Sequence, residues 1–229
     1  MFRQAPRAVF TTLKRGIFAV VWSCALLAPA IGDTVDPHGW SLAPPSQPLL
    51  DEAKNAAHRR YQLGFENYVT PNVNLIDAEG HKRSLKALLD SDTPTILQFI
   101  FTTCATTCPV LTASVVSAQG EIAKLSSNYQ IVSISIDPEY DTPQQLQSYA
   151  LRTGAGGNWT FLTGSSADIR TTLKAFDALN RGDNKMYHQP YTYIRARPGR
   201  PWTRIDGLIS ARNLVDEFRA VLNPTASAR

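Results

Sequence analysis

Two cysteines separated by three residues are the most chemically reactive feature of the sequence. They lie in the stretch Phe101-Thr-Thr-Cys104-Ala-Thr-Thr-Cys108-Pro109. This spacing lets both sulfurs face one side of a tight turn, where they can form a disulfide or bind one ion. Soft thiolates prefer Cu(I) or Zn(II) among the common metals. The pair predicts redox chemistry or metal binding, with two inert buried cysteines as the remaining interpretation.

The number of cysteines favours a local chemical role for this pair. The chain has three cysteines, and the third, Cys24, lies near the N-terminus. Small secreted domains that depend on disulfides use more cysteines, spaced to close long loops. A bond between Cys104 and Cys108 would close a very short loop and add little stability. Redox or metal chemistry therefore explains the pair better than structural cross-linking.

His188 is the natural candidate for a third ligand. It stands in Lys185-Met-Tyr-His-Gln-Pro190, just before an expected strand at Tyr191–Ile194. Imidazole binds copper, zinc or iron, so two thiolates and one imidazole would make a three-ligand site. A histidine beside a strand is also commonly a solvated or hydrogen-bonded structural residue. Both interpretations stay open at this point.

The cysteines are expected to lie between a buried strand and the start of a helix. Thr95–Phe101 is an almost continuous apolar run, typical of a strand buried on both faces. Pro109 is expected to open a helix over 110–125, because a proline at the first helical position leaves no N–H unpaired. The positive end of the helix dipole favours thiolate over thiol at this terminus.

A second strand end carries the run Asp137-Pro-Glu-Tyr-Asp-Thr-Pro143. Gln130–Ile136 is expected to be a central strand, so Asp137 follows its carboxyl end. Asp137 is a candidate for orienting His188 or tuning the thiols, and an ordinary Asp-Pro turn explains it equally well. Asp141 and Thr142 are expected to cap the helix that begins at Pro143.

The order of the elements predicts an α/β thioredoxin-like fold with a central mixed sheet flanked by helices and an N-terminal hairpin. The remaining elements are expected as a hairpin over 73–84, a helical turn at 85–89, a strand at 159–162, a helix at 166–179, a hairpin over 191–209 through Pro198-Gly199, and a helix at 213–222. In such open sheets, ligands bind beyond the carboxyl ends of the strands. Cys104 and Asp137 both follow strand ends, so we expect them at one edge of the sheet.

Residues 1–31 have the pattern of an export signal. Basic residues precede the apolar run Gly16–Ile31, whose sixteen residues are short against the roughly 20 of a comfortable membrane span. Ala28-Pro29-Ala30 matches the small-residue pattern of a signal-peptidase site. A cleaved signal, an uncleaved membrane anchor and lipidation at Cys24 are the three interpretations. Each predicts export, to the periplasm or the outer face of the cytoplasmic membrane.

The rest of the chain divides into three parts. Residues 32–64 are expected to be a Pro-rich and polar connector with a short helix at 51–60, residues 65–224 the folded domain, and residues 225–229 a disordered tail. Four of the 23 basic residues fall in the export segment, and the remaining 19 match the 19 acidic residues. The folded part is therefore neutral, with no basic block that would indicate nucleic-acid binding.

Taken together, the motifs resemble the Sco/SenC family. The resemblance rests on Phe-x-x-Cys-x-x-x-Cys-Pro, on the strand ending in Asp-Pro-x-x-Asp-Thr-Pro, on Trp-x-Phe-Leu-Thr-Gly and on a late histidine, in family order over about 65–222. Two features differ from many members: the spacer is Ala105-Thr-Thr107, without proline or an acidic residue, and Thr102-Thr103 precede the first cysteine. These differences leave the candidate ligand residues unchanged. They are expected to affect the redox potential and the copper affinity of the site.

The resemblance implies one copper per domain, bound by Cys104, Cys108 and His188. Two thiolates favour Cu(I), and holding Cu(II) as well would require His188. The implied role is a metallochaperone that delivers copper to cytochrome c oxidase or matures its dinuclear copper centre. Its implied partners are the copper-bearing subunit or another copper acceptor, a copper donor protein and a thiol reductant.

A thiol-disulfide oxidoreductase is the main alternative function. Cys104 would attack a partner disulfide and Cys108 would resolve the mixed disulfide. This activity does not need His188, so the histidine distinguishes the enzyme from the chaperone. A peroxidase is a weaker interpretation, because no peroxidatic Thr-x-x-Cys setting with an arginine partner is evident.

Overall fold

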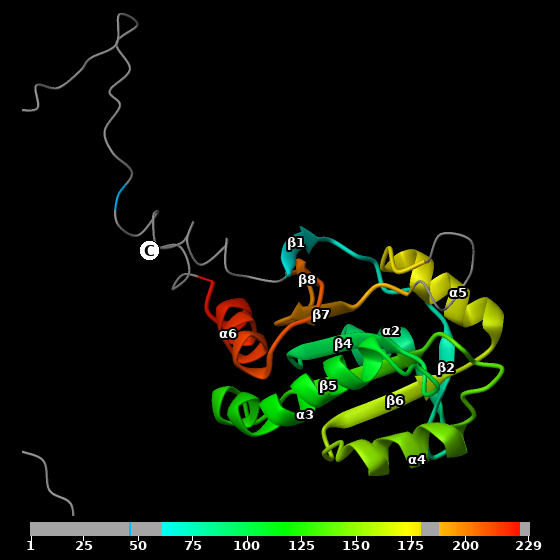
Figure 1. The fold of residues 1–229 in the computed structure, drawn as a ribbon. Coiled ribbons are helices and arrows are strands. Elements are labelled where there is room, and N and C mark those ends of the chain that lie inside the picture. The colour runs from blue at the N-terminus through cyan, green and yellow to red at the C-terminus, as the bar shows by residue number, and fades with distance from the viewer. Residues whose placement is uncertain (1–45, 47–60, 180–187, 225–229) are drawn as a thin grey trace, which may run out of the picture. The chain divides into compact units, whose positions relative to one another are not determined.

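The computed structural model describes residue 46 and the ranges 61–179 and 188–224 (Figure 1). The chain divides into a unit of Met1–Pro45 and a unit of Ser46–Arg229, and every helix and strand given below belongs to the second unit. Four predicted features lie wholly or mostly outside the described residues: the export segment at 1–31, the connector at 32–64, its helix at 51–60 and the tail at 225–229.

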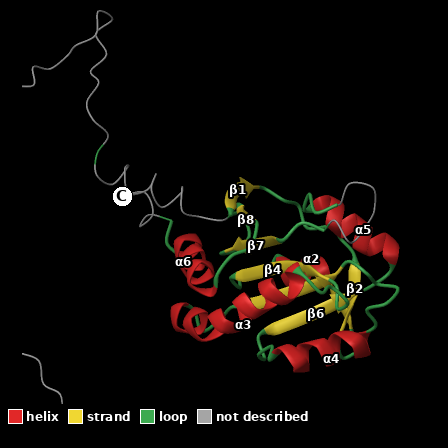
Figure 2. Ribbon diagram, in the orientation of Figure 1, coloured by secondary structure: helices red, strands yellow, loops and turns green. Residues whose placement is uncertain are grey.

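Eight strands form one mixed sheet in the order β1-β8-β7-β4-β5-β6-β2-β3 (Figure 2). The strands are β1 (Gln62–Glu66), β2 (Asn74–Asp77), β3 (Lys82–Ser84), β4 (Thr95–Ile100), β5 (Gln130–Ser135), β6 (Trp159–Thr163), β7 (Tyr191–Arg195) and β8 (Trp202–Asp206). The neighbours β4, β5 and β6 are parallel, and antiparallel strands extend the sheet on both sides. β2 and β3 form the predicted N-terminal hairpin.

Helices cover both faces of the sheet and bury a separate apolar cluster on each. They are α2 (Leu85–Leu89), α3 (Thr107–Leu125), α4 (Pro143–Thr153), α5 (Ser166–Ala175) and α6 (Ala211–Leu222). Residues of α3, α4 and α6 cluster with Ile96 and Ile100, whereas residues of α2 and α5 cluster with Leu97 and Phe99. Successive strand residues point to opposite faces, so β4 contributes to both clusters and all six of its residues are buried. The predicted mixed sheet flanked by helices is confirmed.

The carboxyl ends of β4 and β5 meet at one edge of the sheet. Ile100 and Ser135 are register partners in the parallel pair. The N–H of Ile136 continues the ladder by donating to the carbonyl of Ile100 at 2.8 Å. The two loops that leave this edge begin at Phe101 and at Ile136, which directly precedes Asp137. The expectation that Cys104 and Asp137 both follow strand ends here is therefore confirmed.

Several element boundaries differ from the sequence prediction, and one strand was not expected. Helix α3 begins at Thr107 rather than at Pro109, so Cys108 lies inside its first turn. Helix α5 ends at Ala175 instead of residue 179, and Asp177 follows with a positive φ of 50°. Strand β1, paired with β8, was not predicted and begins ahead of the expected domain start at residue 65. Among the described residues, no helix is both long and apolar enough to cross a membrane.

Candidate metal and thiol site

Cys104 lies in the loop between β4 and α3 and accepts a hydrogen bond from the first turn of the helix. Its N–H donates to the carbonyl of Phe101 at 3.1 Å, which closes a turn directly after the strand. The backbone N–H of Cys108 donates to the Cys104 Sγ at 3.3 Å. The N-cap residue Thr106 makes no side-chain capping bond, so the Cys104 sulfur occupies the place of a capping oxygen.

The surroundings of Cys104 stabilise its thiolate. Partial burial alone would raise the pKa of this thiol, but hydrogen bonds outweigh that effect and lower its pKa from 9.0 to about 7. The donors are the Cys108 thiol, the backbone N–H groups of Cys108 and Thr106, and the Thr107 hydroxyl, which lies 3.8 Å from the sulfur. A substantial fraction of Cys104 is therefore a nucleophilic, metal-binding thiolate near neutral pH.

Cys108 has the opposite character. Its side chain is only 2% exposed, whereas Cys104 is half-buried, and both cysteines are free thiols. Burial raises the pKa of Cys108 to about 12, and its hydrogen bond to Cys104 adds to the increase. The pair therefore combines an accessible thiolate with a protonated thiol held beside it.

His188 contacts the strand that leads into this loop. Its Nε2 lies 3.0 Å from the carbonyl oxygen of Phe99, and its buried Nδ1 has no hydrogen-bond partner among the residues that the structure describes. A carbonyl only accepts, so this contact places the proton on Nε2 and leaves the lone pair on Nδ1. Burial lowers the pKa of His188, and the bond to Phe99 opposes it more weakly. The ring is thus a neutral imidazole with a free nitrogen, the form that binds metals.

The structure brings the two sulfurs together and holds the imidazole against the adjoining strand. The candidate ligand atoms of Cys104, Cys108 and His188 do not all lie within 4.8 Å of one another. The donor types nevertheless suit a soft metal ion: two sulfurs, one of them partly ionised near neutral pH, and an imidazole nitrogen that no described residue hydrogen-bonds. The three-ligand set therefore remains a prediction that this arrangement supports chemically.

A second group of metal-binding side chain types has a structural explanation. Asp77, Glu79 and His81 do place ligand atoms within 4.8 Å of one another. However, the buried Asp77 carboxylate accepts hydrogen bonds from the N–H groups of Glu79 and His81, and it pairs with Arg83 Nε at 3.1 Å. Its oxygens stabilise the β2–β3 turn, which accounts for the cluster.

Asp137 follows the end of β5 as expected, whereas Asp141 does not have the capping role expected of it. Asp137 is half-buried, its N–H donates to the Ser135 hydroxyl at 3.0 Å, and its carbonyl accepts from Asp141. Its role in orienting His188 or tuning the thiols stays a prediction. The helix cap is Thr142 alone, whose hydroxyl accepts from the N–H of Gln145. The carboxylate of Asp141 instead binds the loop that carries Cys104, a role that sequence reasoning missed.

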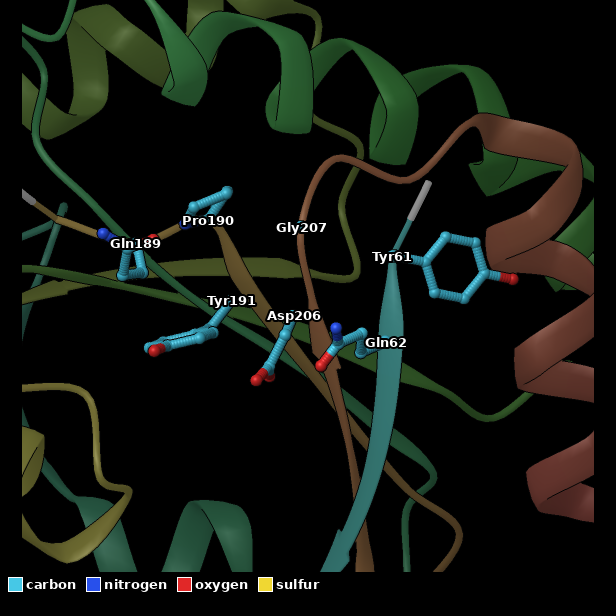
Figure 3. A pocket seen from close by; sticks show the side chains of 7 residues that line it. All are labelled: Tyr61, Gln62, Gln189, Pro190, Tyr191, Asp206 and Gly207. Atoms are coloured by element: carbon cyan, nitrogen blue, oxygen red, sulfur yellow. The ribbon is translucent and has the colours of Figure 1, made fainter. Parts of the chain in front are cut away.

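A shallow groove lies beside His188 in the chain but away from the thiols. Its volume is about 520 Å³. Its lining residues are Tyr61, Gln62, Gln189, Pro190, Tyr191, Asp206 and Gly207 (Figure 3). Tyr61 points its hydroxyl toward α6, where it donates to Glu217 at 2.7 Å. Neither cysteine lines the groove, so it is separate from the thiol site.

A mixed sheet covered on both faces, with a thiol pair between a strand end and a helix start, defines a thioredoxin-like protein. Within that class, the sequence model of the SCO1/SenC family matches residues 62–223. The chain belongs to the SCO1/SenC family.

Individual relatives agree with this membership. A SCO1 homologue of Bacillus subtilis is 32% identical over 140 residues, which cover 58% of this chain and 72% of the homologue. The solved structure of BsSco, a member of the Sco family of cytochrome c oxidase assembly proteins, has 28% identity and a TM-score of 0.57, with 69% and 95% of the two chains covered. Copper-bound ScoI of Arabidopsis thaliana shares the fold, with 24% identity, a TM-score of 0.56 and coverage of 68% and 99%.

Proposed function

We propose that this protein binds one copper ion through Cys104, Cys108 and His188 and passes it to a copper enzyme during assembly. The observation that carries the proposal is the combination of a low-pKa thiol at Cys104 with a His188 Nδ1 that no described residue hydrogen-bonds. Family membership and the copper-bound Sco structures support the choice of copper. BsSco, which belongs to a family of cytochrome c oxidase assembly proteins, supports that oxidase as the acceptor.

Copper is the cargo in this proposal, and each ligand contributes in a different way. Cys104 is partly exposed and partly ionised near neutral pH, so it is suited to make the first bond to an incoming Cu(I) ion. Cys108 would lose its proton on binding, because metal ions bind the thiolate rather than the thiol. His188 would add a neutral nitrogen and allow Cu(II) to be held as well. A cysteine ligand that is only half-buried, as Cys104 is, also permits exchange with a thiol of the acceptor.

The same thiol pair supports a second function, reduction of a partner disulfide. In that reaction, the Cys104 thiolate attacks one sulfur of the partner disulfide and the other partner sulfur leaves as a thiolate. Cys108 then attacks Cys104, so the pair becomes a disulfide and the partner gains two electrons. The difference in pKa between Cys104 and Cys108 favours this order of attack. Copper-site assembly needs reduced thiols, so the two functions are compatible.

We also propose that the protein acts outside the cytoplasm. The support is the pattern of residues 1–31, basic residues followed by a short apolar run and a small-residue cleavage pattern. Expression of the full chain in a Gram-negative bacterium, fractionation and N-terminal sequencing test this. Recovery in the periplasm or membrane supports export, and an intact chain confined to the cytoplasm contradicts it.

Anaerobic titration of the reduced full chain with Cu(I) tests copper binding. A Cys24→Ser variant is the matched control, because it removes the one cysteine outside the proposed site. We expect one tightly bound copper in the wild type and in Cys24→Ser, and sharply weaker binding in Cys104→Ser and Cys108→Ser. Equal binding by wild type and Cys104→Ser would contradict the proposal and leave the dithiol reductant as the function.

A further inference from the structure

Asp141 is a completely buried carboxyl group that the proposed copper site does not itself use. Its side chain is 0% exposed. One carboxylate oxygen accepts from the Thr102 hydroxyl, and the other accepts from the Ser135 hydroxyl at 2.6 Å. The backbone N–H of Thr102 donates to the second oxygen at 3.1 Å. Within the described part of the chain, every side-chain hydrogen bond of Asp141 therefore goes either to the end of β5 or to the loop that follows β4.

The position of Asp141 is itself fixed from both sides. Its own N–H donates to the carbonyl of Asp137 at 2.8 Å, which anchors it to the end of β5. Thr142 directly follows it and caps α4. Because α4 has its own cap and the 137–141 turn is closed by backbone bonds, neither element requires the Asp141 carboxylate. Burying a carboxylate costs free energy unless its oxygens accept hydrogen bonds. The burial of Asp141 therefore needs an explanation other than capping α4 or closing the 137–141 turn.

That explanation lies in the short turn that places Cys104. Thr102 is inside the turn that the Cys104 N–H closes on the carbonyl of Phe101. Holding Thr102 by both its N–H and its hydroxyl fixes the turn relative to β5. This turn also sets the location of the Cys104 sulfur. The sulfur accepts a hydrogen bond from the N–H of Cys108 at the start of α3.

We propose that Asp141 is a positioning residue for the thiol pair: it holds the Cys104 loop to β5 through Thr102 and so keeps the two sulfurs close together. The copper part of this inference rests on the proposed function. Its mechanical part concerns the separation of two thiols and does not depend on copper. Two thiols held side by side have a high effective concentration, which favours both chelation of one ion and formation of their mutual disulfide.

The test compares variants in a Cys24→Ser background, so that the only thiols are the pair. Asp141→Asn keeps the shape of the side chain, and Thr102→Val removes one hydroxyl while the carboxylate keeps Ser135 and the Thr102 N–H. Asp77→Asn is the matched control, because Asp77 is another buried carboxylate that holds a turn, here between β2 and β3. The double variant of Asp141→Asn and Thr102→Val shows whether the two residues act through one contact.

Two readouts are measured on each folded variant. The first is the equilibrium of the thiol pair with reduced and oxidised glutathione. The second is Cu(I) affinity by competition with a chromogenic chelator. We expect Asp141→Asn and Thr102→Val each to weaken copper binding about tenfold, the lower range for a residue that orients ligands. We expect each variant to lower the equilibrium constant for forming the Cys104–Cys108 disulfide by a similar factor. A tenfold change corresponds to about 30 mV for a two-electron couple.

The outcomes separate positioning from general stability. We expect the double variant to lose little more copper affinity and disulfide stability than either single variant. We expect Asp77→Asn to keep the wild-type glutathione equilibrium and copper affinity, even where its unfolding midpoint falls. Wild-type glutathione equilibrium and copper affinity in Asp141→Asn and Thr102→Val would overturn the inference. If Asp141→Asn does not fold, Thr102→Val decides the matter by the same readouts. If the wild type binds no copper, the proposed function fails and the glutathione equilibrium still tests Asp141.

Discussion

The Sγ of Cys104 accepts the backbone N–H of Cys108 at 3.3 Å, in the first turn of α3. A side-chain oxygen commonly fills this place at a helix start, but the N-cap Thr106 makes no such bond. A sulfur in that position gains more from the N–H and from the helix dipole when it is ionised. The fold places the start of a helix close after a central strand. The resulting contact between the Cys108 N–H and the Cys104 sulfur stabilises the thiolate.

This contact predicts the pH dependence of Cys104 reactivity. Only the thiolate reacts, so the rate of alkylation by iodoacetamide should rise with pH and level off above an inflection near pH 7. Cys108, with a pKa raised to about 12 and little exposure, should be labelled slowly over the same range. Peptide mass spectrometry of the reduced full chain distinguishes the three cysteines. An inflection at pH 9 or above for Cys104 would show that the hydrogen bonds do not outweigh the effect of its burial.

His188→Ala should separate the two functions of the thiol pair. It removes the proposed nitrogen ligand, so copper affinity should fall by at least about tenfold, since even residues that only orient ligands cost that much. Reduction of a small disulfide substrate should stay close to wild type, because that reaction uses the cysteines alone. His81→Ala is the matched control, with an exposed histidine on the β2–β3 turn. Equal copper binding by His188→Ala and His81→Ala would remove His188 from the site.

The aromatic core beneath the site should determine much of the stability. Phe99 is buried, with its ring near those of Phe176 and Tyr193. Phe99→Ala should lower the free energy of unfolding by about 3–5 kcal/mol, measured by urea denaturation. Phe65→Ala is the control, because Phe65 is 66% exposed and its loss should change stability by about 0.5 kcal/mol or less. Similar losses for both variants would contradict the assigned core.

The central strands and the cysteine loop could be predicted because their signals are local. Thr95–Ile100 is apolar except for Thr95 and Gln98, and its burial on both faces follows from that pattern. The start of α3 was misplaced because Pro109 favours a first helical position but is accepted equally within the first turn, where its missing N–H also costs nothing. β1 was missed because its five residues mix polar and apolar types behind a polar connector.

The contacts that tune the site could not be predicted because they join distant residues. The bond between His188 and Phe99 spans 89 positions, and that between Asp141 and Thr102 spans 39. An aspartate before Thr-Pro looks like a helix cap in the sequence, and only its burial in the fold shows another role. Residue types gave the candidate ligands, while their protonation states depend on burial and hydrogen bonds that the tertiary structure creates.

X-ray absorption at the copper edge tests the central claim most directly. The sample is the full chain loaded with one equivalent of Cu(I), with His188→Ala and Cys24→Ser measured beside it. The three-ligand site predicts two sulfur neighbours and one imidazole nitrogen in the wild type and in Cys24→Ser, and loss of the nitrogen in His188→Ala. A wild-type spectrum with sulfur neighbours alone, unchanged by His188→Ala, would contradict the proposed copper site.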